Sequence, residues 1–152
     1  MTLSRPEQDA LWLERLRRDG PPDADNRDLA FADALRPSLE LLRNRRYWDA
    51  HESLEDLWRE APYPLRLFHY ALIKVAVGLL HIERRNLAAA RRQLEQAATY
   101  LEPFTPAFAT LDTGKVLAQV RERLDLLAST DATEFRALNS MEEFVLPDAP
   151  AE

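Results

Sequence analysis

Residues 65–84, LRLFHYALIKVAVGLLHIER, decide the fold of this chain, because they form one long and almost wholly apolar segment. Pro64 stands directly before the segment, where a proline suits the start of a helix. The most apolar part, residues 71–82, contains Lys74 and His81 and is shorter than the about 20 residues that a membrane span requires. The segment therefore predicts the buried central helix of a globular domain rather than a membrane anchor.

The composition fits a single domain that spans residues 1–152, with its core motif in about 26–102. The chain has 152 residues, of which 46% are hydrophobic, and a formal net charge of −6. This acidic balance argues against a partner that is nucleic acid or an anionic membrane. The chain has no cysteine, which excludes disulfides and thiolate nucleophiles. Its first residues show no secretory signal, so we expect a cytoplasmic protein.

Helical spacing of apolar residues extends along most of the chain. It is clearest over residues 87–101, and proline, glycine or capping residues mark most of the helix ends. Further helices are expected from Ser4 or Arg5 to Gly20, over about 26–44, 47–60 and 65–84, and after Asp112 or Thr113 through Leu127. We expect a loop over 21–26, one more short helix over 131–138 and an extended tail over about 139–152. Pro37 either kinks the second helix or starts a new one, and the pattern does not choose between the two. The prediction is an all-α bundle of about six or seven helices.

One sequence pattern occurs twice. Tyr47, Ala50 and Leu54 have the same spacing as Leu87, Ala90 and Leu94, forty residues later, and both sets follow Arg-Arg or Arg-Asn. This period resembles the helix pairing of tetratricopeptide-type repeats. Two copies are too few for a solenoid, so we expect paired antiparallel helices within one bundle.

The segment YWDAHESLEDLW, residues 47–58, is the densest group of polar and aromatic residues. Helical geometry places Ser53 on the face opposite the core and His51 and Glu55 at the border of the buried face. Trp48 and Glu52 continue this border, where pockets form. Trp58 belongs to the buried face.

The central helix carries a matching stripe made of Tyr70, Lys74, Gly78 and His81. A lysine among apolar residues needs a carboxylate partner or loses its proton, and Glu52 or Glu55 could supply that partner. Gly78 would let a backbone, an indole or a ligand approach closely. His69 lies about 140° from this stripe and is expected at the surface or at the helix start.

Three functions fit these pocket residues. The preferred one is a non-catalytic binding or interaction domain, in which a His-Glu-Trp network with Lys74 and Tyr70 fixes helix register and no cofactor is needed. The second is a divalent metal site made of His51, Glu55 and His81. The third is a hydrolase-like acid/base enzyme that uses His51, Glu52, Glu55 and Lys74. Residues 51–55, HESLE, do not form the H-E-x-x-H zinc motif, because Glu55 stands where the motif has its second histidine.

Partners are predicted only by class. The seam of residues 87–101 would serve either the core or a contact with a protein partner or a second copy of the chain. Arginine clusters at residues 43–46, 84–85 and 91–92 could attract an anion, although charge runs are usually solvated.

The motif A-H-E-x-L-E-x-x-W at residues 50–58, followed downstream by His81 and Asn86, resembles a family of small prokaryotic proteins described as domain of unknown function 309. The resemblance covers residues 47–94 and implies an all-helical single domain. It implies no reaction, because the family has no established activity. Two departures concern Arg85 and Ala89, where the family resemblance leads us to expect glycine. A third is His69, where it leads us to expect glutamine.

Overall fold

The computed structural model describes residues 2–128, 138 and 143–150. Within these residues the fold is all-α and contains no strand, which confirms the predicted fold class. The helices are α1 (Arg5–Asp19), α2 (Asp23–Asn26), α3 (Leu29–Arg43), α4 (Tyr47–Glu60), α5 (Leu65–Glu83), α6 (Leu87–Leu101) and α7 (Thr113–Leu127), and a 3-10 helix, η1 (Glu102–Phe104), follows α6.

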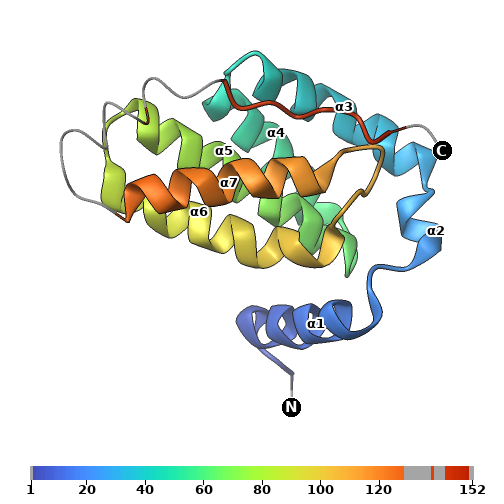
Figure 1. Cartoon of the computed structure of the whole chain (residues 1–152). Helices are drawn as coiled ribbons and strands as arrows, with labels where there is room; N and C mark the ends of the chain where they lie inside the picture. Colours follow the sequence, from blue (N-terminus) through green and yellow to red (C-terminus); the bar gives the residue numbers. More distant parts are fainter. Residues whose placement is uncertain (1, 129–137, 139–142, 151–152) are drawn as a thin grey trace.

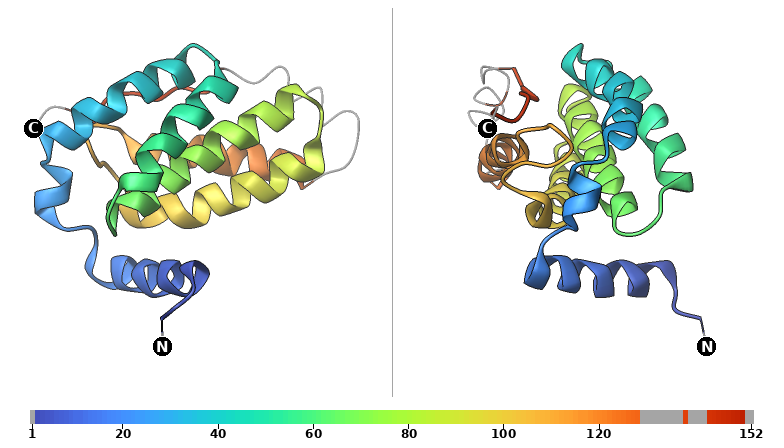
Figure 2. Two further views of the ribbon diagram at one scale, coloured as in Figure 1. Left: turned by 180° about the vertical axis from the view of Figure 1, so that it is seen from behind. Right: turned by 90° about the vertical axis from the view of Figure 1, so that its right-hand side faces the viewer.

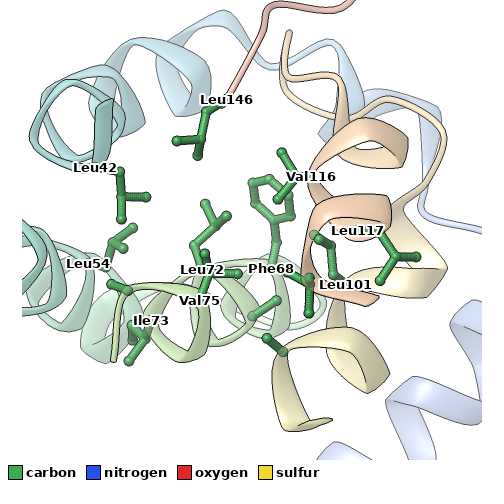
Figure 3. Packing of buried hydrophobic residues seen from close by; sticks show 14 of the residues in the cluster. Leu42, Leu54, Phe68, Leu72, Ile73, Val75, Leu101, Val116, Leu117 and Leu146 are labelled. Carbon is green, nitrogen blue, oxygen red and sulfur yellow. The ribbon is translucent and has the colours of Figure 1, made fainter. Parts of the chain in front are cut away.

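Helix α5 is the central element, and α4 and α6 pack along it (Figure 1). Its residues Phe68, Leu72 and Val75 are fully buried. Figure 3 shows side chains from α3, α4, α6, α7 and the C-terminal segment directed toward them. By length and hydropathy α5 could cross a membrane, but 61% of that stretch is buried inside the protein. The predicted buried central helix is therefore confirmed.

The pairs α3–α4 and α5–α6 are joined by the same turn. Arg45 and Arg85 occupy its left-handed position, with φ of 61° and 60°. In both turns a backbone hydrogen bond of 2.9 Å closes the helix end, from Arg46 to Leu41 and from Asn86 to His81. This is the Schellman arrangement, in which glycine is the usual left-handed residue. The repeated sequence pattern therefore marks a repeated turn. The left-handed backbone at Arg85 also explains why the family resemblance leads us to expect glycine at this position.

Two expectations about the first half of the chain are settled by the structure. Pro37 lies inside one continuous helix, α3, and does not start a new one. Proline has no N–H, so the carbonyl of Asp33 loses its helical hydrogen bond. Asp33 and Pro37 are both exposed, so water can bind to this carbonyl instead. The expected loop over 21–26 is wrong in part, because Asp23–Asn26 form the single turn α2. The acidic side chains of Asp23 and Asp25 favour this helix start.

The described part of the C-terminal tail, residues 143–150, is non-helical and lies between α3 and α7 (Figure 1). Arg43 of α3 donates hydrogen bonds of 2.6 and 3.0 Å to the carbonyl of Leu146. Gln119 of α7 exchanges two hydrogen bonds of 2.8 Å with the backbone of Val145. Phe144 and Leu146 are buried, so the tail completes the core. The short helix predicted over 131–138 lies outside the described residues, apart from Leu138.

Helix α1 crosses the other helices at one end of the bundle (Figure 2, right). Its Leu13 and Leu16 are buried. The ring of Trp12 stacks on Tyr63, in the loop before α5, with 5.7 Å between ring centroids. Aromatic stacking of this kind stabilises the contact between two elements that are far apart in the sequence.

Candidate functional site

The two ring nitrogens of His51 each lie near a hydrogen-bond acceptor of its own helix, α4. Its Nε2 lies 3.0 Å from a carboxylate oxygen of Glu55, one turn later. Its Nδ1 lies 3.3 Å from the backbone carbonyl of Trp48, one turn earlier. The His51 side chain is 17% exposed. The predicted proximity of His51 and Glu55 therefore exists, but these contacts lie within α4 and do not connect it to α5.

Tyr70, Lys74 and His81 are half-buried on α5, and we call these three residues the α5 strip. The ammonium of Lys74 lies 4.9 Å from the centre of the Tyr70 ring. Burial lowers the pKa of Lys74, and the Glu55 carboxylate opposes this effect. No carboxylate of the described residues forms an ion pair with Lys74. Glu55 is thus its electrostatic neighbour, whereas Glu52, the other predicted partner, is exposed.

An aromatic row joins α4, α5 and α6 at one end of the α5 strip. The ring of Trp58 lies 6.3 Å from that of Tyr70, which lies 4.6 Å from that of Tyr100. The guanidinium groups of Arg5 and Arg66 approach the Trp58 ring to 4.9 and 4.8 Å. Trp58 is therefore the member of the predicted network that connects α4 to α5. Trp48, by contrast, is 51% exposed at the other end of α4.

Gly78 serves helix packing. A β-carbon at this position would lie 2.5 Å from Cδ2 of Leu94 in α6. The close approach expected at Gly78 is therefore that of an apolar side chain, and it allows α6 to pack tightly on α5.

The residues of the predicted metal site do not come together as a ligand set. Among residues 2–128, 138 and 143–150, no group of three or more histidine, aspartate and glutamate side chains is placed to hold a metal ion. His51 pairs with Glu55, whereas Nδ1 of His81 is buried without a hydrogen-bond partner among the described residues.

Ser53 does not face away from the neighbouring helices, as the helical spacing had indicated. Its hydroxyl lies 2.6 Å from the hydroxyl of Ser38 in α3. The prediction is wrong because α4 packs against α3 as well as α5, so that two of its faces are covered.

His69 is buried, and its expected place at the surface is wrong. It is 3% exposed, because α3 covers this side of α5 and brings Phe31 within 5.0 Å of the imidazole centre. Burial lowers the pKa of His69 to about 4. At neutral pH the side chain is therefore an uncharged imidazole in an apolar setting.

Asp9 of α1 is a buried carboxylate that the sequence analysis missed. It accepts a hydrogen bond of 2.6 Å from the hydroxyl of Tyr63 and one of 3.4 Å from that of Tyr100. A signal was present, because Asp9 shares one helical face with the apolar residues Leu13 and Leu16.

This geometry defines a small helical domain with a polar and aromatic surface over its central helix. Residues 35–93, from α3 into α6, match the family described as "Domain of unknown function (DUF309)". The resemblance drawn from the motif at residues 50–58 is confirmed.

The chain is also a distant homologue of the uncharacterized protein YpuF of Bacillus subtilis (strain 168). The two are 29% identical over 106 residues, which are 68% of this chain and 59% of YpuF. The match therefore spans about three fifths of that relative. A comparison with solved structures finds no match.

Proposed function

We propose that this domain is a non-catalytic binding module and that the α5 strip holds a carboxylate-rich segment of a protein partner. The observation that carries the proposal is the state of Lys74. Its ammonium is half-buried on an aromatic ring, and no carboxylate of the described residues forms an ion pair with it. An incoming carboxylate would supply the missing partner at a site where part of the desolvation has already occurred.

The surroundings of Lys74 suit a protein ligand. Tyr70 offers aromatic contact area next to the ammonium, and the Trp58 ring lies beside that of Tyr70. Residues of these types are enriched at protein interfaces. Trp48, exposed at the far end of α4, extends this surface. A carboxylate placed on Lys74 would thus have apolar neighbours that help to exclude water.

The arrangement around His51 supports binding rather than acid/base catalysis. A general base needs a ring nitrogen that can take a proton from the substrate. Both ring nitrogens of His51 face hydrogen-bond acceptors of α4, namely Glu55 and the carbonyl of Trp48. A neutral imidazole carries one N–H and donates to one of these acceptors, while its other ring nitrogen lies against the second acceptor of the same helix.

The proposal is tested by mapping backbone amide shifts in NMR spectra during titration with a hexaglutamate peptide, and with hexaglutamine as the uncharged counterpart. Hexaglutamate should shift the amides around Lys74 in a saturable and salt-sensitive manner. The Lys74→Gln variant should lose this response. Lys115→Gln is the matched control, because Lys115 is the other lysine of the chain and is exposed on α7. Equal responses in the two variants, or no response to hexaglutamate, would contradict the proposal.

A further inference from the structure

A recess lies on the other side of α5, away from the α5 strip. It has a volume of about 550 Å³ and lies between α3, the end of α4 and the start of α5. Phe31 and Ala34 of α3, Leu57 of α4, and Leu65 and His69 of α5 line it. This volume is within the range of sites that bind small molecules.

His69 is the polar group of this recess. It is 3% exposed, and its Nδ1 is buried without a hydrogen-bond partner among the described residues. Buried polar atoms are paired in the great majority of cases, so an unpaired one needs an explanation. Because the imidazole is uncharged at neutral pH, it can donate or accept a hydrogen bond without a counter-ion.

The remaining lining residues determine which ligand charge suits the recess. Its walls are apolar, with the Phe31 ring 5.0 Å from the imidazole. Asp56, Arg59 and Glu60 stand at its exposed rim. Arg59 is already bound to Asp56 at 2.9 Å and to Glu55 at 3.4 Å. Arg59 is the cationic group among these rim residues, and its carboxylate partners leave it unavailable to an anionic ligand. Glu60 would repel such a ligand.

We infer that this recess is a binding site for a small uncharged molecule with a compact apolar body and one hydrogen-bonding group, which pairs with His69. The apolar body would contact Phe31 and Leu57 and displace water from the walls. The hydrogen-bonding group would meet the imidazole and remove the cost of leaving it unpaired. The site is independent of the proposed binding surface at Lys74, and either can be wrong without the other.

The test uses benzyl alcohol as the probe, with benzoate as its charged counterpart. Binding is followed at neutral pH by NMR through the imidazole C–H resonances, which are simple to assign in a chain with three histidines. We expect a saturable shift of the His69 resonances with benzyl alcohol and much weaker binding of benzoate. Binding of benzoate as tight as that of benzyl alcohol would overturn the uncharged ligand class.

Two variants locate the site. Ala34 is an exposed residue of α3 that lines the recess, so Ala34→Phe should fill the recess and abolish binding. Ala88→Phe, at an exposed position of α6, should leave binding unchanged. His69→Phe keeps the apolar body of the side chain and should weaken binding about tenfold, followed through the amides of Leu57 and Leu65. No saturable shift in the wild type, or equal binding in Ala34→Phe and Ala88→Phe, would overturn the inference. Unchanged affinity in His69→Phe would overturn the role of His69.

Discussion

The hydroxyl of Tyr63 donates a hydrogen bond of 2.6 Å to the buried carboxylate of Asp9, and this bond fastens α1 to the loop before α5. The hydroxyl of Tyr100 adds a longer contact of 3.4 Å from α6. Burial and the neighbouring carboxylate raise the pKa of Tyr63 and of Tyr100 to about 12. Both phenols therefore remain protonated donors over the whole range in which the protein would work.

Asp9→Ala should loosen α1. We expect the free energy of unfolding to fall by about 1–3 kcal/mol, because the half-buried hydroxyls of Tyr63 and Tyr100 lose their acceptor. Hydrogen exchange of the α1 amides, measured by mass spectrometry, should become faster, whereas that of α5 changes little. Glu14→Ala is the control, since Glu14 is exposed on the same helix. Slow exchange of α1 in Asp9→Ala would show that Leu13 and Leu16 hold the helix without the carboxylate.

Gly78→Ala should destabilise the protein by about 1–3 kcal/mol, because the added methyl group overlaps the Leu94 side chain in a filled core. The effect should disappear or change sign in a Leu94→Ala background, where alanine at position 78 gains helix propensity over glycine. A double-mutant cycle measured by urea denaturation gives this coupling directly. Equal costs in the two backgrounds would mean that the overlap with Leu94 is not the cause.

Arg45→Gly should stabilise the protein by about 1 kcal/mol, since the left-handed backbone at this position disfavours any residue with a β-carbon. Arg45→Ala is the matched variant. It also removes the ion pair with Glu143, at 3.4 Å and exposed, but it keeps the backbone strain. Melting temperatures should therefore rank the glycine variant above the alanine variant. Because both variants lack the ion pair, the reverse order would contradict a cost of the left-handed backbone at position 45.

His69 should make stability depend on pH. Its pKa is about 4 in the folded state and 6.5 when the group is unperturbed. Between these values the unfolded chain binds a proton that the folded protein does not bind, so stability falls as the pH is lowered from about 6.5 toward 4. The loss should reach up to about 3 kcal/mol at the lower end.

The measurement compares urea denaturation of the wild type and of His69→Phe across this pH range. Asp56 and Glu60, the carboxylates near the recess, are present in both proteins. The difference in the free energy of unfolding between wild type and variant isolates the contribution of His69. This difference should already change between pH 6.5 and 5. Parallel curves for the two proteins would contradict a buried neutral imidazole.

The helices and the buried centre could be predicted from sequence because their signals are local. Pro64 and the segment 84–86 mark the ends of α5, and His51 and Glu55 meet because they are four positions apart on one helix. The positive φ of Arg45 and Arg85 could not be predicted from residue type, since neither residue is glycine or asparagine. The repeated pattern around them was nevertheless visible.

The errors concern contacts between helices whose relative rotation the sequence does not show. Ser53 and His69 both lie on faces that were expected to be open, and both are covered by α3. The bond from Tyr63 to Asp9 connects residues 54 positions apart. Spacing along one helix shows which residues share a face, but it does not show which neighbour covers that face.

The repeated turn has a consequence for how the chain reaches this structure. Each turn closes a helix pair through hydrogen bonds between residues five positions apart, so α3 can meet α4, and α5 can meet α6, soon after either pair leaves the ribosome. Chains dominated by such local contacts fold quickly, because little loop entropy is lost before the contacts form. We expect the two hairpins to form first, and the C-terminal segment, which must wait for both α3 and α7, to dock last.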